Sequence, residues 1–271
     1  MQNRDRGVAQ LGTVLAVWAH PDDETYLAGG LMALAVEAGC RVVCVTATHG
    51  EHGTAEPRRW PPARLATVRE RELAASLAAL GVEEHHWLGI EDGYCATASS
   101  IGPVATIGRI IREVGADTVV TFGPDGMTGH PDHRAVSRWT TQAWATSGAN
   151  GRLLYVASTP GFATRFRSLH ERFGVFEPGL PSVTPEGELA VHLRLQGELL
   201  DRKVVALRAQ ASQTAALIAA MGEDRFREWC TEESFVALPS RPPWRAAPRP
   251  FVADATMRTA TVTDRPLAAV G

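Results

Sequence analysis

The sequence has no large excess of charge of either sign. Its 27 Lys and Arg residues nearly balance its 30 Asp and Glu residues, and the formal net charge is −3. Attraction to nucleic acid or to an anionic membrane surface requires clustered basic charge. We therefore expect no nucleic-acid partner and no membrane partner.

Cysteine is scarce, and long apolar runs are missing. The four cysteines in 271 residues form no C-x-x-C pair, which argues against a disulfide framework and predicts free thiols in a reducing compartment. The first residues, MQNRDRGVAQLG, lack the apolar stretch of a signal peptide. No apolar run is long enough to cross a bilayer. Together these absences predict a cytoplasmic location.

Strand-like and helix-like segments alternate over the first 160 residues. Short β-branched runs predict buried strands at 13–19, 41–48, 85–90, 117–122 and 153–158. Apolar residues at helical spacing predict helices at 25–38, 62–80, 103–114 and 131–147. Such alternation is typical of an α/β fold, with a mostly parallel sheet and helices on both faces.

We expect a single domain over residues 1–271. Its core would be 1–160, followed by a substrate-side extension over 161–238 that contains one long helix at 197–221. The segment from 239 onward begins PSRPPWRAAPRP, and its Pro and Arg content predicts an extended tail.

The stretch AHPDDE, residues 19–24, places a histidine and three carboxylates directly after the first predicted strand. A solvated turn is the usual interpretation of a charge cluster. Here no turn residues separate the cluster from the buried strand, and a cation would relieve its like-charge repulsion. An acidic pair alone would suit Mg²⁺, which prefers oxygen ligands. The histidine instead favours Zn²⁺, Fe²⁺ or Co²⁺.

A second cluster, GHPDH at 129–133, supplies further nitrogen ligands. Pro131 suits the first position of a helix, which places His130 at the cap and His133 in the first turn. The helix dipole disfavours a protonated imidazole there, so His133 is expected to be neutral and able to bind a metal. A lone histidine at such a position is more often a surface residue. Because ligands of open α/β sheets bind beyond the carboxyl ends of the strands, both clusters predict one metal site at that rim.

The paired motifs resemble the LmbE-like, or PIG-L, family of N-acetylglucosaminyl deacetylases. This family includes zinc enzymes of mycothiol and bacillithiol biosynthesis and the mycothiol conjugate amidase. The segment KVVALRAQASQ also resembles the family, but Gln210 stands where the family often has histidine, which puts the role of that histidine in doubt here. Weaker similarities are THGEHG (48–53), Arg69 and Glu72 in the helix at 62–80, and LGIEDG (88–93).

The resemblance implies a Rossmann-like α/β fold with a metal site at the rim formed by the strand carboxyl ends. It implies a hydrolase that removes an N-acetyl or related N-acyl group from a small amino-sugar substrate. The implied zinc ligands are His20, Asp23 and His133. The implied catalytic residues are Asp22 as general base and His130 as oxyanion stabiliser or proton donor, oriented by Asp132. The implied substrate-binding residues are Arg69 and Asp92, which would contact sugar hydroxyls or an anion.

Three alternatives stay open at this point. A mycothiol-conjugate-type amidase would use the same site, a Mg²⁺-dependent phosphoryl-transfer or signalling domain would use only its carboxylates, and a binding protein would keep the fold without catalysis. The chain lacks a P-loop motif, which weighs against the second. Homo-oligomer formation and the exact substrate are likewise left open.

Other polar and aromatic residues have simpler interpretations. Glu24 is expected to cap the following helix. Trp18, Trp139 and Trp144 are expected in the core. Trp60 and Tyr94 fall in rim loops, where they would be surface aromatics or would stack on a sugar ring.

Overall fold

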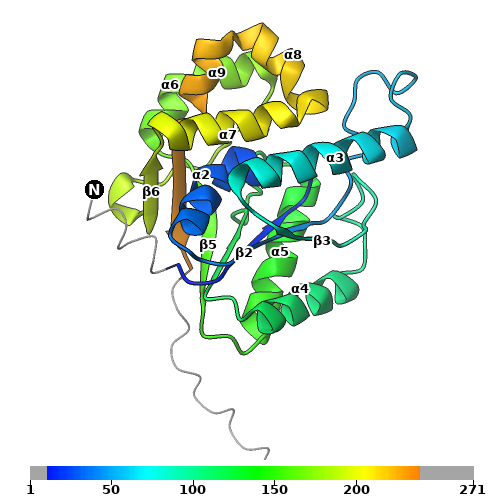
Figure 1. The fold of residues 1–271 in the computed structure, drawn as a ribbon, viewed down its shortest axis with the longest axis vertical. Helices are drawn as coiled ribbons and strands as arrows, with labels where there is room; N and C mark the ends of the chain where they lie inside the picture. The colour runs from blue at the N-terminus through cyan, green and yellow to red at the C-terminus, as the bar shows by residue number, and fades with distance from the viewer. Residues whose placement is uncertain (1–10, 239–271) are drawn as a thin grey trace, which may run out of the picture. The chain divides into compact units, whose positions relative to one another are not determined.

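The computed structural model describes residues 11–238; the extended tail predicted from residue 239 and the N-terminal ten residues lie outside this range. Its strands form one sheet in the order β3-β2-β1-β4-β5-β7-β6. Helices α2, α3 and α7 pack on one face, and α4 and α5 pack on the other (Figure 1). The strands are β1 (Val14–Trp18), β2 (Val42–Thr46), β3 (Glu84–Trp87), β4 (Thr118–Thr121), β5 (Arg152–Ala157), β6 (Val191–Arg194) and β7 (Glu232–Ala237). The helices are α2 (Asp23–Glu37), α3 (Pro62–Leu80), α4 (Ile101–Val114), α5 (Pro131–Thr146), α6 (Pro160–Phe173), α7 (Gly197–Ala209), α8 (Ala211–Met221) and α9 (Glu223–Trp229), with a 3-10 turn, η1 (Glu186–Glu188).

The predicted mostly parallel sheet is confirmed. Strands β1 to β5 pair in parallel, and each overlaps one of the predicted strand segments. All residues of β1, β2 and β4 are buried, because helices cover both faces of the sheet. Burial on both faces explains why these strands read as continuous apolar runs and not as alternating patterns.

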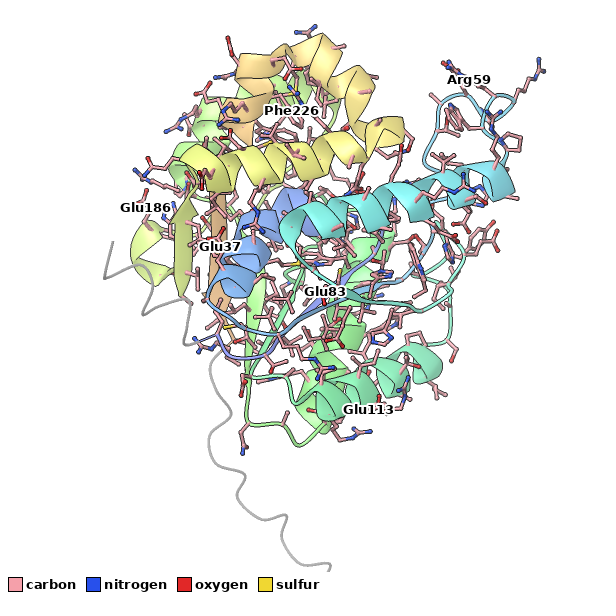
Figure 2. All side chains as sticks on the ribbon, viewed as in Figure 1. Glu37, Arg59, Glu83, Glu113, Glu186 and Phe226 are labelled. Atoms are coloured by element: carbon pink, nitrogen blue, oxygen red, sulfur yellow. The ribbon has the colours of Figure 1, made fainter. Side chains whose placement is uncertain are left out.

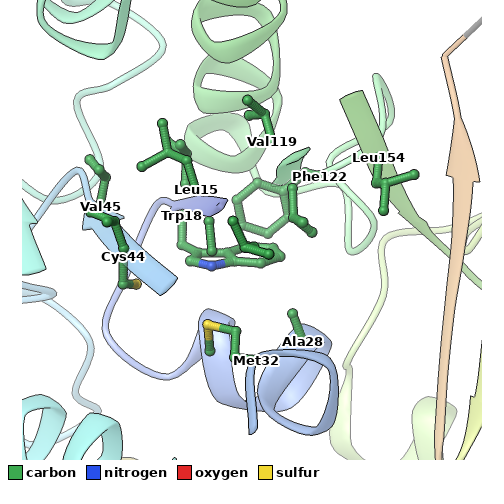
Figure 3. Close-up of a cluster of buried hydrophobic side chains, with 14 of the residues drawn as sticks. Leu15, Trp18, Ala28, Met32, Cys44, Val45, Val119, Phe122 and Leu154 are labelled. Atoms are coloured by element: carbon green, nitrogen blue, oxygen red, sulfur yellow. The ribbon is translucent and has the colours of Figure 1, made fainter. Parts of the chain in front are cut away.

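Beneath the carboxyl end of β1, aromatic packing fixes the centre of the core. The indole of Trp18 meets the ring of Phe122 edge to face, with centroids 5.1 Å apart. Figure 3 shows Trp18 between Phe122 and the α2 side chains of Ala28 and Met32. The expected core positions of Trp18, Trp139 and Trp144 are confirmed, since all three are buried.

The chain after residue 160 contains elements that the sequence did not predict. Strand β7 pairs antiparallel with β5, and β6 pairs antiparallel with β7. The two antiparallel strands extend the parallel sheet at one edge. Their short, mixed sequences show no clear alternation of polar and apolar residues. Only the pairing in the sheet, β7 with β5 and β6 with β7, defines them.

The predicted single helix over 197–221 is wrong. It is two helices, α7 and α8, that meet at Gln210 with a bend of 116°. The side-chain amide of Gln210 is buried and donates hydrogen bonds to Glu24 and Ser76. The helix is interrupted at this residue. Glu72 of α3 then accepts a hydrogen bond from Ser212 N at 2.8 Å, which satisfies a free N–H at the start of α8. No single helix within 11–238 is long and apolar enough to cross a membrane, and only this sharply bent pair passes on combined length and composition.

A buried ion pair ties α7 and β7 into the middle of α2. Lys203 Nζ lies 2.7 Å from Glu233 Oε1, and both side chains are almost fully buried. The Glu233 carboxylate accepts from Gly30 N and Leu31 N, while Lys203 donates to the Tyr26 carbonyl. Gly30 N and Tyr26 O are the N–H and C=O of one helical turn, so the two charges contact the two ends of that turn.

We expect Lys203→Met to lower the free energy of unfolding by about 3–5 kcal/mol, because the Glu233 carboxylate would stay buried without its counter-charge. Urea unfolding measures this. The control is Arg208→Ala, which removes an exposed ion pair with Glu223 from the same helix and should cost far less. Equal losses in the two variants would contradict the importance assigned to the buried pair.

Candidate metal centre

The predicted site residues lie where the order of the parallel strands reverses. The chain runs outward from β1 to β2 and β3 on one side, then returns to β4 and β5 on the other. The loops after β1 and β4 therefore diverge and leave a crevice at their carboxyl ends. Residues 19–23 enter this crevice from β1, and residues 122–131 enter it from β4.

Three of the predicted metal ligands converge in this crevice. His20 Nδ1 lies 3.2 Å from His133 Nε2. Asp23 places one carboxylate oxygen 3.3 Å from His133 Nε2 and the other 3.5 Å from His20 Nδ1. Within the described residues His130 joins the two histidines in a group whose ligand atoms lie within 4.8 Å of one another, and Asp92 and Asp132 form a second such group with His20.

In both His20 and His133, the ring nitrogen that faces away from the other histidine lies next to an acceptor and therefore carries a proton. His133 Nδ1 lies 3.0 Å from the Gly126 carbonyl, to which it donates, so Nε2 keeps its lone pair. His20 Nε2 lies 3.1 Å from Asp92 and 3.3 Å from Asp132, so its proton belongs there and Nδ1 faces inward. Such outer partners orient metal-binding histidines. His133 Nε2, His20 Nδ1 and a carboxylate then face one another. Burial would lower the pKa of His20, but its contacts with Asp132, Asp23 and Asp92 raise it well above the usual value, so a proton or a metal cation at Nδ1 relieves this crowding.

His133 is held in its neutral form by its surroundings. Its ring stacks on Phe122, with centroids 4.2 Å apart and planes 13° from parallel. Burial lowers the pKa of His133 to about 4, although the nearby Asp23 opposes the shift. Burial would raise the pKa of Asp23, but the charges of His133 and His20 and hydrogen bonds from His20 lower it to about 2. The pair therefore presents a neutral imidazole and an ionised carboxylate, both of which are metal ligands.

Asp22 stands next to this cluster in an unusual backbone conformation. Its φ of 108° lies in the region that favours glycine and that residues with a side chain rarely adopt. The Asp22 N–H donates to Glu24 Oε2 at 3.0 Å, which fixes this turn at the start of α2. Burial raises the pKa of Asp22 to about 7 against the opposing charge of Arg69, and Asp23 adds to the rise. A carboxyl group with a pKa near neutrality can both accept and release a proton.

Arg69 contacts protein groups in this structure, and its predicted contact with substrate stays a prediction. Its guanidinium is buried and donates to the carbonyls of Pro21 and Gly50 and, at 3.4 Å, to Asp22 Oδ2. A Cβ on Gly50 or Gly53 would lie within 2.5 Å of Arg69 Nη1, so the two glycines of THGEHG leave room for this side chain. The buried guanidinium therefore holds Asp22 and its loop in position.

Asp92 and Asp132 also have other partners than predicted. Asp92 accepts from His52 N as well as facing His20, so it is not free to contact a sugar through every oxygen. The Asp132 carboxylate accepts from Gly93 N at 2.8 Å and Cys95 N at 3.0 Å and contacts His20. The expected orientation of His130 by Asp132 stays a prediction for the Asp132 side chain. It is the backbone N–H of Asp132 that donates to His130 Nδ1, at 3.2 Å.

The expectation that Glu24 only caps α2 is too simple. Glu24 is fully buried, and its Oε1 accepts from Gln210 Nε2 at 2.7 Å. Its other oxygen holds the Asp22 N–H. Gln210, which replaces the histidine common in the resembled family, thus lies in the layer that supports Asp22 and does not reach the metal centre through any described contact. The glutamine at position 210 was the only sequence signal for the Gln210–Glu24 contact, and the two residues are 186 positions apart.

The rim aromatics have different surroundings. Trp60 is half-buried beneath the guanidinium groups of Arg59 and Arg64. Tyr94 is 55% exposed. A stacking role on a sugar ring stays a prediction for both.

Comparison with known proteins identifies relatives of this chain. The family model described as "GlcNAc-PI de-N-acetylase" (PIG-L) matches residues 15–144. A 1D-myo-inositol 2-acetamido-2-deoxy-alpha-D-glucopyranoside deacetylase of Kineococcus radiotolerans is 33% identical over 247 residues, covering 74% of this chain and 68% of the relative. The deacetylase of the same name from Rhodococcus opacus is 32% identical, covering 83% of this chain and 91% of the relative.

A solved structure shares the fold. The N,N'-diacetylchitobiose deacetylase from Pyrococcus horikoshii superposes with a TM-score of 0.57 at 21% identity, covering 84% of each chain. At this identity the likeness concerns the fold alone.

We expect His133→Ala to weaken zinc binding by at least roughly 10–100-fold, because losing only a group that hydrogen-bonds to a metal ligand already costs that much. The reason is that the variant removes an inward-facing nitrogen from the cluster. Zinc content after loading and gel filtration measures this, and thermal unfolding confirms that the variant is folded. His86→Ala, which removes an exposed histidine of β3, should keep full zinc content. Unchanged zinc content in His133→Ala would show that the ligand set is different.

Proposed function

The chain belongs to the PIG-L family of de-N-acetylases, and from this we propose that it is a zinc-dependent hydrolase that removes the N-acetyl group from an N-acetylglucosamine-type substrate. The relatives named above are deacetylases of an N-acetylglucosamine linked to inositol. The observation that carries the proposal is the convergence of His20, Asp23 and His133 with Asp22 beside them, at the carboxyl end of β1.

The donor set supports zinc as the metal. His20, His133 and Asp23 offer two imidazole nitrogens and one carboxylate, the combination found in three-ligand catalytic zinc sites. Mg²⁺ prefers an all-oxygen shell, whereas Fe²⁺ and Co²⁺ suit the same ligands as zinc. A bound Zn²⁺ supplies Lewis acidity, which polarises a carbonyl and makes water a better nucleophile near neutral pH.

Asp22 is the residue that takes a proton from water. Neighbouring side chains diverge, so Asp22 does not share the inward direction of Asp23 but lies next to it. The contact from Arg69 at 3.4 Å restrains Asp22 Oδ2. The hydrogen bond from its N–H to Glu24 restrains the backbone. The carboxylate is therefore presented in one orientation, which general base catalysis requires.

His130 is placed to act on the other side of the reacting amide. Its ring lies edge to face with His20, with centroids 4.8 Å apart, and it is exposed enough to meet a substrate. Because Nδ1 accepts from Asp132 N, Nε2 is the nitrogen that carries a proton toward the substrate. That N–H can stabilise the oxyanion. Because burial lowers the pKa of His130 and leaves the ring neutral, the proton that Asp22 takes from water is the one available to the leaving amine.

The substrate proposed is a small N-acetylglucosamine-type amino sugar. GlcNAc-inositol is the first compound to assay, because the names of the relatives contain it. A conjugate-type amidase on the same site would use the same residues. The two differ in their products: a deacetylase releases acetate, and an amidase releases a larger acid or amine from its conjugate.

We expect Asp22→Asn to reduce kcat for acetate release by about 10²–10⁴-fold while zinc content stays at the wild-type value, because the amide cannot accept a proton. The assay uses GlcNAc-inositol, free GlcNAc and a mycothiol conjugate. The matched control is Asp224→Asn, which changes an exposed carboxylate of α9 and should leave the rate unchanged.

Equal loss of zinc and activity in Asp22→Asn would make Asp22 a ligand and overturn its role as base. Turnover of the conjugate without acetate release would replace the deacetylase with the amidase.

A further inference from the structure

A cavity of about 570 Å³ opens beside the proposed reaction centre. Asp22 and Asp23 form its wall at one end, together with Met127 and Thr128 of the loop after β4. From there it extends toward the elements that follow residue 156. Its size lies within the range of about 300–1,000 Å³ that encloses a drug-sized ligand, far more than an acetyl group needs.

Aromatic side chains form much of the cavity wall. They come from α2 and from the segments after β5: Tyr26, Phe162, Phe173, Phe176 and Trp229. All five are half-buried, so part of each ring is available to a ligand. Figure 1 shows α6, α8 and α9 gathered beyond α7, and Figure 2 shows Phe226 within this group of helices. Phe226 is fully buried, so the wall rests on a packed core of its own.

Two hydroxyl groups of the cavity lining have no hydrogen-bond partner. Ser158 follows β5 and is 3% exposed, and Ser234 of β7 is 4% exposed. Both residues line the cavity, and both hydroxyls are buried and unpaired within the described structure. A buried hydroxyl left without a partner costs free energy. Both oxygens are covered in the present rotamers, and rotation of either serine side chain toward the cavity would let a polar group of a ligand bond to its hydroxyl.

We propose that the substrate carries an aromatic or alkyl aglycone with a polar substituent, and that this aglycone fills the cavity; the inference rests on the proposed deacetylase function. In an N-acetylglucosamine glycoside the aglycone at C1 is adjacent to the acetamido group at C2. An amide held against Asp22 and Asp23 therefore brings the aglycone to the mouth of the cavity. The rings favour the apolar part by removing it from water.

A longer N-acyl chain is the other occupant that the position allows. Both groups are attached close to the reacting amide. A plain acyl chain offers nothing to the hydroxyls of Ser158 and Ser234, whereas a substituted aglycone does. The unpaired hydroxyls therefore favour the aglycone.

The test compares acetate release from the phenyl and methyl glycosides of GlcNAc, in both anomers, by the zinc-loaded protein. We expect kcat/KM to be about tenfold or more higher for the better phenyl glycoside, mainly through a lower KM, because a ring is buried on binding. Phe162→Ala should bring the phenyl-to-methyl ratio close to one. Ile101→Ala removes an exposed apolar side chain of α4 outside the cavity and should leave the ratio unchanged.

A second series tests the hydroxyls and the rival occupant. A 4-hydroxyphenyl glycoside should bind more tightly than the phenyl glycoside, and Ser234→Ala should remove this difference. Methyl glycosides of N-acetyl and N-hexanoyl glucosamine vary the acyl chain alone. A gain that follows acyl length and not the aglycone would assign the cavity to the acyl chain and overturn the proposal.

Calorimetric binding separates this proposal from the deacetylase function. Phenyl glucoside, which has no amide, should bind the protein and should lose affinity in Phe162→Ala. Binding of this kind without acetate release from any glycoside would leave the cavity assignment standing and the deacetylase function wrong. Acetate release at equal kcat/KM from phenyl and methyl glycosides would keep the function and overturn the cavity assignment, as would the absence of any phenyl glucoside binding.

Discussion

The crowding of acceptor groups at the carboxyl ends of β1 and β4 governs this structure. His20, Asp23 and His133 point lone pairs or negative charge into one small volume, at distances of 3.2 to 3.5 Å. Burial opposes a charge on His20, but the carboxylates around it raise its pKa, so a proton there or a metal cation offsets the repulsion. Other interactions hold the three side chains in place. Much of the surrounding structure consists of those interactions: the Gly126 carbonyl on His133, two carboxylates on His20, and Phe122 stacked beneath the His133 ring.

A second layer of buried polar groups holds Asp22, the proposed general base. Asp22 has a backbone conformation that few L-residues adopt, and Glu24 accepts its N–H. Glu24 is in turn bound by Gln210 at the bend between α7 and α8. Arg69 crosses from α3 to restrain the Asp22 carboxylate and the Pro21 carbonyl. Gln210 therefore supports the turn at Asp22 through Glu24.

The part of the chain after residue 156 adds an aromatic cavity wall beside the site. The core of the sheet provides the proposed polar reaction centre, whereas α6 and α9 contribute aromatic rings to the neighbouring cavity. The Lys203–Glu233 pair joins the two parts, since it connects α7 and β7 to the backbone of α2, the helix that follows Asp22. The proposed chemistry and the proposed substrate selection thus lie in different segments of one fold.

The sequence by itself determined the parallel core and the composition of the metal cluster. Fully buried strands appear as apolar runs, and AHPDDE and GHPDH place ligand-type residues directly after two of them, which are local signals. It did not determine the bend at Gln210, the strands β6 and β7, or the partners of Arg69, Asp92 and Asp132. Each of these depends on contacts between residues far apart in the chain: Gln210 meets Glu24 across 186 positions, and Asp132 meets His20 across 112. Only the tertiary structure decided them, because a buried polar group takes whichever partner the packing brings within reach, and local spacing carries no record of that partner.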